Sequence, residues 1–260
     1  MEWFDTHAHL FEEAILSQID DVLDRAAQAD VKTIVAVGTT LEDSRTCIEL
    51  AEKYPQIYAS VGIHPNHSAE AQPGDREKVE ELMSHPKVVA IGETGLDRYW
   101  DYAPFDLQKE YLDWHVKKSR QYGKPLIIHM RECEQDIVDW LEASKADGPL
   151  NGILHSYTGD AKLAELGVDC GMHISFAGML TFKSNQVLRD VAKTIPAERL
   201  LVETDCPYLS PEPCRKQRPN EPALVVHTGS CLAYERGLDP TEMAQQTTAN
   251  AKKLFGIAEA

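Results

Sequence analysis

The sequence lacks several features that direct a chain to particular classes of protein. It has no apolar run approaching the roughly 18 residues of a membrane span, and its amino terminus, MEWFDTHAHL, carries neither a basic segment nor the apolar stretch of a signal peptide. We therefore expect a cytoplasmic protein that does not contact a membrane. The six cysteines form no CxxC pair, so we expect reduced thiols, mostly in the core. The chain also lacks a GxGxxG or Walker-type loop.

Basic residues are scarce. The 26 lysines and arginines face 42 aspartates and glutamates, which gives a formal net charge of −16. This balance argues against a protein that holds nucleic acid by surface charge alone. To bind a polyanionic substrate, the protein would need positive charge close to the binding site, and bound divalent cations would supply it.

The rest of the composition is that of an ordinary globular protein, with 43% hydrophobic and 26% charged residues. Strand-like runs alternate with helical patterns from end to end. The predicted strands lie near 3–7, 32–37, 57–62, 87–92, 125–129, 151–155, 170–176 and 199–204. The predicted helices lie near 17–30, 41–54, 75–85, 104–122, 132–145, 159–167, 184–194, 221–236 and 240–255.

Eight strand-helix units are typical of an α/β protein with a (β/α)₈ TIM barrel, here followed by an extra C-terminal helix. No linker or shift in composition divides the chain, so we expect a single domain over residues 1–260. An open, doubly wound sheet is the alternative, but the chain lacks the glycine-rich phosphate loop that would support it.

Ionisable side chains fall at the carboxyl ends of several predicted strands. In a barrel these ends converge on one mouth, where the active sites of this fold lie, so residues far apart in the chain become neighbours. The candidate metal ligands at these ends are His7, His9, Glu93, His129, His155 and Asp205. His7 and His9 are two residues apart, so on a strand both imidazoles project to the same side. The pattern predicts a metal centre.

A carboxylate among four histidines suits two metals, because its two oxygens can bridge ions about 3.5–4 Å apart. Glu93 is the candidate bridge. Imidazole and carboxylate ligands accept Mg²⁺, Mn²⁺ and Zn²⁺, so the sequence leaves the identity of the two divalent ions open.

Other residues near these strand ends are candidates for supporting roles. Asp205 would position or deprotonate the attacking water, and Glu203 would assist the proton transfer. Asp5 and Glu203 share strand parity with ligands, so they are also candidate hydrogen-bond acceptors for them. His64 closes the third predicted strand and would orient substrate. The remaining histidines are expected at the surface or in packing positions: His67, His85, His115, His173 and His227.

Basic and aromatic residues near the mouth are candidate substrate contacts. The basic ones are Arg131, just after His129, and Arg215, Lys216 and Arg218 in the loop after the eighth strand. Arginine forks bind phosphate oxygens in a bidentate manner. Tyr99 and Trp100, with Tyr102 close by, follow the fourth strand and could stack on bases or pack their own loop.

Motifs along essentially the whole chain resemble those of the TatD family of metal-dependent deoxyribonucleases, in the amidohydrolase-like group of barrels. The motifs are DTHAHL at 5–10, GIHP at 62–65, GETGLD at 92–97, IIHMR at 127–131, HSYTG at 155–159, ETDCPYL at 203–209, NEP at 220–222 and TANAKKLF at 248–255. The resemblance implies one divalent ion held by His7, His9 and Asp205, and a second held by His129 and His155. Glu93 would be shared, and exonuclease action on DNA is implied as well.

The chain departs from the family pattern at three positions. Thr94 stands where isoleucine is common, Tyr157 where the family has HxFxG, and Pro219 separates Arg218 from the NEP motif. No candidate metal ligand is lost. The inserted proline affects the expected phosphate contact of Arg218.

Three hypotheses follow. The first is a phosphodiesterase acting on DNA, with single-stranded ends preferred. The second is an amidohydrolase-type enzyme that cleaves a C–N or ester bond in a small molecule or an aminoacylated RNA. Many such enzymes bridge their metals with a carboxylated lysine, whereas here the strand carries Glu93 and the nearest lysine, Lys87, lies at its start. The third is an inactive scaffold, which a complete ligand set disfavours. The sequence indicates no obligate protein partner and leaves the oligomeric state open.

Overall fold

A nearly closed parallel barrel forms the centre of the molecule. The computed structural model describes residues 1–258, and its eight strands pair in parallel and in chain order. A bridge between Ala8 and Cys206 brings the two ends of the sheet together. The strands are β1 (Trp3–Ala8), β2 (Val31–Val37), β3 (Ile57–Val61), β4 (Val88–Asp97), β5 (Leu126–Arg131), β6 (Gly152–Leu154), β7 (Met172–Phe176) and β8 (Leu200–Val202). The predicted TIM barrel is therefore confirmed.

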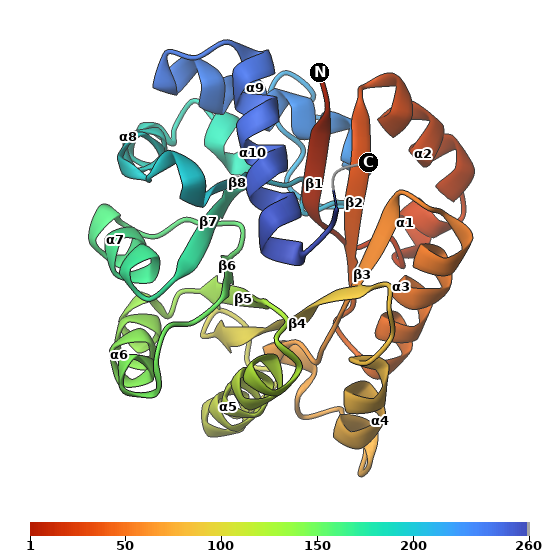
Figure 1. Ribbon diagram of the computed structural model, residues 1–260, viewed down its shortest axis with the longest axis vertical. Helices are drawn as coiled ribbons and strands as arrows, with labels where there is room; N and C mark the ends of the chain where they lie inside the picture. The colour runs from red at the N-terminus through yellow and green to blue at the C-terminus, as the bar shows by residue number, and fades with distance from the viewer. Residues whose placement is uncertain (259–260) are drawn as a thin grey trace.

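Helices surround the strands, as Figure 1 shows. They are α1 (Glu13–Leu16), α2 (Ile19–Gln28), α3 (Leu41–Lys53), α4 (Asp75–Leu82), α5 (Phe105–Tyr122), α6 (Glu134–Ser144), α7 (Ala161–Asp169), α8 (Gln186–Thr194), α9 (Val225–Arg236) and α10 (Pro240–Phe255). Short 3₁₀ turns lie between them, among them η1 (Pro65–His67), η4 (Ala197–Arg199) and η5 (Pro222–Leu224). The additional C-terminal helix is α10.

Predicted and observed boundaries differ most near the mouth. β4 continues to Asp97, five residues beyond the predicted end, because it pairs with β5 as far as Asp97 and Arg131. Glu93 therefore lies inside a strand. β6 and β8 end at Leu154 and Val202, so the polar residues that follow them lie in loops. Pairing with β5, rather than local pattern, therefore sets the end of β4.

The strands are hydrophobic on both sides because helices cover the barrel and side chains fill it. One cluster of core residues lies between the strands and helices, and includes Ile34, Ile128 and Leu200. A second cluster takes alternating residues of the same strands, such as Val35, Ile127 and Leu201. Since successive strand residues point to opposite sides, the second cluster is the interior of the barrel.

The end of α10 closes the amino end of the barrel. Leu254 and Phe255 belong to the interior cluster, and the rings of Phe4 and Phe255 stack with centroids 5.7 Å apart. Asn250 donates hydrogen bonds to the carbonyls of Ala197 and Leu200 at the start of β8. In Figure 1, α10 crosses the middle of the view beside β1 and β8. The barrel therefore has an apolar floor and is open only at the carboxyl ends of its strands.

Most of the cysteines lie in the core, as expected. All six are free, and four of them are buried: Cys47, Cys133, Cys170 and Cys206. Among residues 1–258, no helix has both the length and the apolar character needed to cross a membrane.

Candidate metal centre

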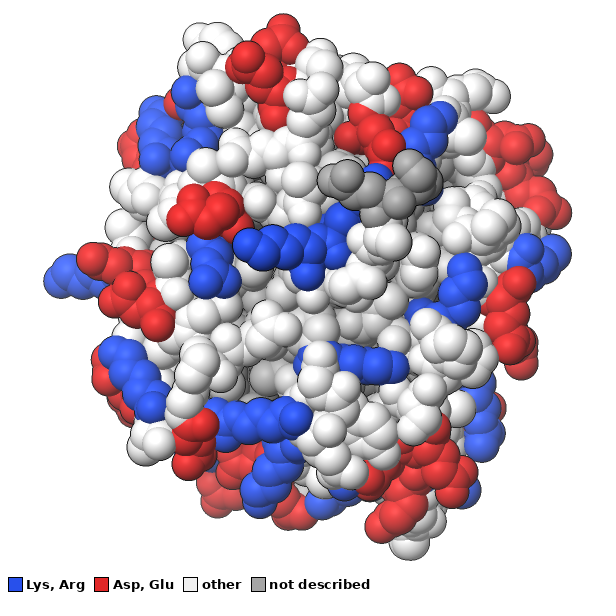
Figure 2. Space-filling model, viewed as in Figure 1, with Lys and Arg blue, Asp and Glu red and all other residues white. Residues whose placement is uncertain are grey.

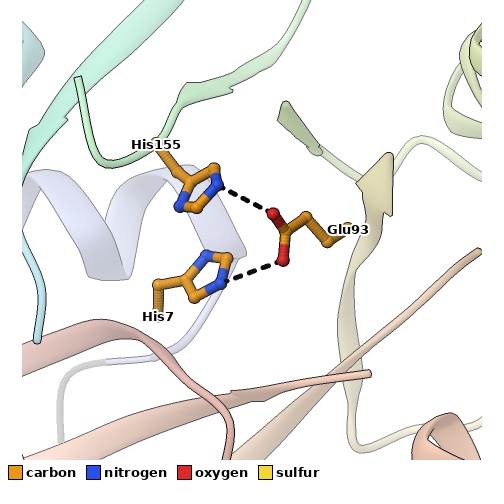
Figure 3. Close-up of side chains that lie close together, drawn as sticks. All are labelled: His7, Glu93 and His155. Carbon is orange, nitrogen blue, oxygen red and sulfur yellow. Dashed lines mark ion pairs between the residues drawn. The ribbon is translucent and has the colours of Figure 1, made fainter. Parts of the chain in front are cut away.

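Glu93 lies at the centre of the polar mouth. It is buried, and its two carboxylate oxygens face different histidines. His7 Nε2 lies 3.3 Å from Oε2, and His155 Nε2 lies 2.9 Å from Oε1. Figure 3 shows these two imidazoles on the same side of the carboxylate, with their rings stacked 4.0 Å apart. One carboxylate therefore presents each of its oxygens to a separate nitrogen donor, as a bridging ligand must.

Two glycines allow β4 to place Glu93 there. Gly92 and Gly95 have φ angles of 141° and 144°, which side-chain-bearing residues rarely adopt. A Cβ atom at Gly95 would collide with the backbone carbonyl of His129, and one at Gly92 with that of Ile127. The glycines of the GETG motif thus bring β4 close against β5 and set Glu93 beside His129.

His9 and Asp205 complete one side of the centre. His9 Nε2 lies 3.4 Å from Asp205 Oδ1, 3.6 Å from Glu93 Oε2 and 3.2 Å from His7 Nε2. His9 Nδ1 donates a hydrogen bond to the carbonyl of Val37, so Nε2 is the nitrogen that faces the two carboxylates. Imidazole nitrogens and carboxylate oxygens that converge in this way fit a divalent cation.

The backbone around Asp205 is held in an uncommon conformation. Asp205 has a φ of 53°, in the left-handed region. Its N–H donates to the carbonyl of His7, and Asn220 donates to the carbonyls of Thr204 and Tyr208 on either side. Asn220 of the NEP motif therefore helps to hold the loop that presents Asp205 to His9.

His129 and His64 lie on the other side of Glu93. His129 Nδ1 is 2.9 Å from Glu93 Oε1, and its Nε2 is 2.9 Å from Asp97 Oδ2. His64 Nε2 is 3.4 Å from Glu93 Oε1, while its Nδ1 accepts a hydrogen bond from the N–H of Asn66. This arrangement puts the proton of neutral His64 on Nε2, so His64 donates to Glu93 rather than offering it a lone pair.

Glu203 and Asp5 contact backbone and ligand side chains. Glu203 Oε1 accepts hydrogen bonds from His155 Nδ1 at 3.2 Å and from the N–H of Ser156 at 2.7 Å. His155 thereby keeps Nε2 free to face Glu93. Asp5 accepts from the N–H and hydroxyl of Thr204 and from the N–H of His7. Asp5 therefore joins the start of the barrel to the loop that carries Asp205.

Burial and neighbouring charges shift the pKa values in the mouth. Burial favours the neutral acid, but the imidazoles of His155, His64 and His7 keep the pKa of Glu93 well below its usual value. Burial disfavours the imidazolium of His9, yet Asp205 and Glu93 raise its pKa to about 9. Burial, together with the charge of His129, lowers the pKa of His64 to about 4. Burial raises the pKa of Asp5 to about 8.

The donor atoms form three groups that could each hold a metal ion. They are His7, Glu93 and His155; His7, His9 and Asp205; and His64, Glu93 and His129, with the donors in each group within 4.8 Å of one another. The six candidate ligands from the sequence all belong to these groups. His64 also lies in the third group by distance, but its Nε2 turns a proton rather than a lone pair towards Glu93, and its role in orienting substrate stays a prediction.

The predicted substrate contacts divide into two sets. The Arg131 guanidinium carbon lies 3.7 Å from the ring centroid of Tyr99 and 5.7 Å from that of Trp100, and all three side chains are exposed. Trp100 in turn stacks on Tyr102 with centroids 5.2 Å apart. We call these four residues the aromatic–arginine cluster. It lies at the mouth, because Arg131 ends β5 only two residues after His129.

The second set lies in the loop after β8, and two of its side chains contact other parts of the protein. Arg215 lies 3.4 Å above the ring centroid of Phe182, and Arg218 donates to Ser210 and to the carbonyls of Arg215 and Gln217. Arg218 therefore stabilises its own loop. Lys216 is exposed.

Sequence reasoning missed Asp97. Its carboxylate is buried, contacts His129, Asn66 and the backbone of the next loop, and has its pKa lowered to about 2, since hydrogen bonds from His129 and Trp100 outweigh burial. The signal was present, because residues 93, 95 and 97 share one side of a strand. The predicted strand ends at residue 92, however, and so leaves Asp97 outside it.

Known proteins resemble this chain along its whole length. The family described as "TatD related DNase" matches residues 4–256. A Bacillus subtilis protein described as "Uncharacterized metal-dependent hydrolase YabD" is 39% identical, and the match covers 98% of this chain and 99% of that protein. The Salmonella typhimurium "3'-5' ssDNA/RNA exonuclease TatD" is 33% identical over 98% of this chain and 99% of that protein.

The solved structures agree. The crystal structure of YjjV, a TatD homologue from Escherichia coli K12, has a TM-score of 0.92 and 29% identity, and covers 98% of both chains. The barrel and its mouth of histidines and carboxylates thus define a metal-dependent hydrolase. The chain belongs to the TatD family.

Proposed function

We propose that the protein hydrolyses phosphodiester bonds of DNA from an end, with single strands or frayed ends preferred. The observation that carries the proposal is the convergence of four histidines on Glu93, with Asp205 beside His9 and the aromatic–arginine cluster at the same mouth. The four histidines are His7, His9, His129 and His155. The Salmonella relative, named for exonuclease action on single-stranded DNA and RNA, supports the substrate class.

Two divalent cations fit the donor set. His7, His9 and Asp205 would hold one, His129 and His155 the other, and Glu93 would be shared. Such ions polarise a phosphoryl oxygen, lower the pKa of water towards neutrality and stabilise the leaving oxygen. Mg²⁺, Mn²⁺ and Zn²⁺ all suit these ligands.

The protein's own groups would orient and accept protons. Asp205 is partly exposed and carries a lowered pKa, because hydrogen bonding to His9 and the charges of His7 and His155 outweigh burial. Its carboxylate is therefore ionised and placed to position water or take its proton. Glu203 would support this chemistry through its hydrogen bond to His155. His64, neutral with a proton on Nε2, would donate to Glu93 or to a substrate oxygen.

Substrate binding would fall to a few side chains at the mouth. Arg131 would meet phosphate, with Arg215, Lys216 and Arg218 as further cationic groups, and Tyr99 and Trp100 would stack on bases. Figure 2 shows acidic and basic side chains interspersed on the face that α10 covers, which is the face opposite the mouth. A net charge of −16 disfavours extended binding of a duplex.

The test is to incubate metal-loaded protein with end-labelled single- and double-stranded DNA, beside a panel of ester and amide substrates. We expect shortening of the single strand from one end. Asp205→Asn is the control: turnover should fall by about 10²-fold or more with DNA binding little changed, because the amide cannot accept a proton. Intact single strands together with cleavage of an ester or amide would replace this proposal by the amidohydrolase hypothesis.

A further inference from the structure

Asp97 touches two parts of the mouth at once. Its Oδ2 lies 2.9 Å from His129 Nε2 and 3.1 Å from Asn66 Nδ2, and its Oδ1 accepts hydrogen bonds from the N–H groups of Tyr99 and Trp100 at 2.8 and 3.0 Å. The side chain is buried. One oxygen of the carboxylate therefore faces a candidate metal ligand, and the other faces the loop that carries exposed aromatic residues.

On the metal side, Asp97 fixes the orientation of the His129 ring. Both ring nitrogens face carboxylates at 2.9 Å, Nε2 facing Asp97 and Nδ1 facing Glu93. Because an ionised carboxylate only accepts hydrogen bonds, Asp97 holds the Nε2–H group, and Nδ1 is the nitrogen turned towards the proposed metal centre. Carboxylates that orient histidine ligands in this manner typically change metal affinity 10–100-fold when they are removed.

On the loop side, Asp97 anchors the backbone of residues 98–104. The N–H of Asp97 donates to Gln108 Oε1, and Gln108 Nε2 donates to the carbonyls of Asp97 and Ala103, so both ends of the loop are tied to α5. Between these ends, the two N–H groups bound to Asp97 Oδ1 set the direction of Tyr99 and Trp100. Those rings form the aromatic–arginine cluster with Arg131.

We infer that Asp97 is a positioning residue that couples occupancy of the metal centre to the order of the aromatic loop 98–104. A cation on His129 Nδ1 would polarise the Nε2–H group and strengthen its hydrogen bond to Asp97. The same carboxylate would then hold the Tyr99 and Trp100 backbone more firmly. The inference rests on the proposed metal centre, but not on DNA as the substrate.

Asp97→Asn tests the coupling because asparagine cannot satisfy both sides. Its single carbonyl oxygen can face His129 and Asn66 or the two backbone N–H groups, and its NH₂ group then opposes the donors on the other side. The matched control is Asp136→Asn, which removes a carboxylate that binds Arg98 of the same loop at 2.7 and 2.8 Å. The hydrogen bonds of Asp136 to the loop do not involve His129.

The experiment measures Mn²⁺ binding by titration calorimetry and amide hydrogen exchange over residues 98–104, with and without Mn²⁺. In the wild type, Mn²⁺ should slow exchange in this loop. Asp97→Asn should bind at least one Mn²⁺ about 10-fold more weakly or worse and lose the Mn²⁺-dependent protection. Asp136→Asn should exchange faster throughout but keep both the affinity and the response to Mn²⁺.

The inference would be overturned if folded Asp97→Asn bound Mn²⁺ as tightly as the wild type. It would also be overturned if Mn²⁺ did not change the exchange of the loop in the wild type. If Asp97→Asn does not fold, His129→Ala tests the coupling in its place. That variant keeps His7, His9 and Asp205 to bind one ion, and the inference requires that Mn²⁺ no longer protects the loop. Neither readout uses DNA, so a lack of nuclease activity would contradict the proposed function and leave this test intact.

Discussion

The two ends of the barrel are made by the same strands from opposite kinds of residue. At the mouth, His7, Glu93 and His155 are buried polar groups that contact one another. At the floor, Phe4 and Phe255 belong to an apolar cluster that α10 closes. Burying ionisable groups costs stability, whereas burying apolar ones provides it. In this protein, stability therefore comes from the floor and the outer layer, and chemistry from the mouth.

If the two ends divide stability and chemistry in this way, the largest loss of activity without unfolding should follow when the carboxylate at the centre of the mouth is neutralised. Glu93→Gln should lower turnover by about 10³-fold or more, because both proposed ions lose their shared ligand. The barrel should still fold, since its core lies elsewhere. Activity assays, circular dichroism and elemental analysis of metal-reconstituted protein check this. The wild type should approach two ions per chain and the variant should fall below that.

An unfolded Glu93→Gln variant would show that the mouth is structural and would contradict the division between the two ends. Wild-type protein that saturates at one ion would remove the bridging role of Glu93.

A substitution at the floor should have the opposite effect, a loss of stability without a loss of turnover. Phe255 is 6% exposed and stacks on Phe4, so Phe255→Ala should lower the free energy of unfolding by about 3 kcal/mol, while the turnover of the folded enzyme stays unchanged. Denaturant titration and kinetics at low temperature measure both. Tyr234→Ala is the control, because Tyr234 is 81% exposed and its loss should change stability by less than about 0.5 kcal/mol. A large loss of turnover in folded Phe255→Ala would contradict the comparison.

At the rim of the mouth, the substitution of Arg131 separates substrate binding from chemistry. Arg131→Ala should raise the Michaelis constant for a short single strand by about 10-fold, with a smaller effect on turnover, and reduce the salt slope of binding by about 1. Kinetics at two salt concentrations measure this. Arg120→Ala, at an exposed arginine that pairs with Asp147, should leave both unchanged. Unaltered kinetics in Arg131→Ala would remove this arginine from the binding site.

The smallest effect concerns a buried histidine outside the metal centre. His115 Nε2 accepts from the N–H of Ile63 and Nδ1 donates to the carbonyl of Tyr111. Burial lowers its pKa to about 4 from the ordinary 6.5. As the pH falls below 6.5, this histidine binds a proton in the unfolded chain but not in the folded protein. The contribution of His115 to the free energy of unfolding is therefore fully present above pH 6.5 and is lost as the pH falls towards 4.

Over the first pH unit below 6.5, the free energy of unfolding should fall by about 1 kcal/mol less in His115→Gln than in the wild type. Denaturant titrations of wild type and variant at several pH values give the two slopes, and their difference isolates this one ring. Parallel slopes would show that His115 does not titrate between the two states.

Much of the centre could be predicted from sequence because its ligands stand beside strands with a strong hydrophobic pattern. His7, His9 and His129 lie at or next to clear strand ends, and a parallel barrel must bring such ends together. The strand limits at Glu93 and Asp97 could not be predicted in this way. They depend on pairing between β4 and β5 and on the backbone freedom of Gly92 and Gly95.

The alternation of strands and helices, the barrel and the candidate donor side chains can therefore be read from the chain alone, since these follow from periodicity and residue type along short segments. Which atoms meet depends on the tertiary structure. It set the hydrogen bonds that orient the rings of His9, His64 and His129, tied Arg218 to its own loop, and placed Asp97 between His129 and Trp100. Each of these depends on contacts between segments distant in the chain, whose geometry exists only once the barrel has closed.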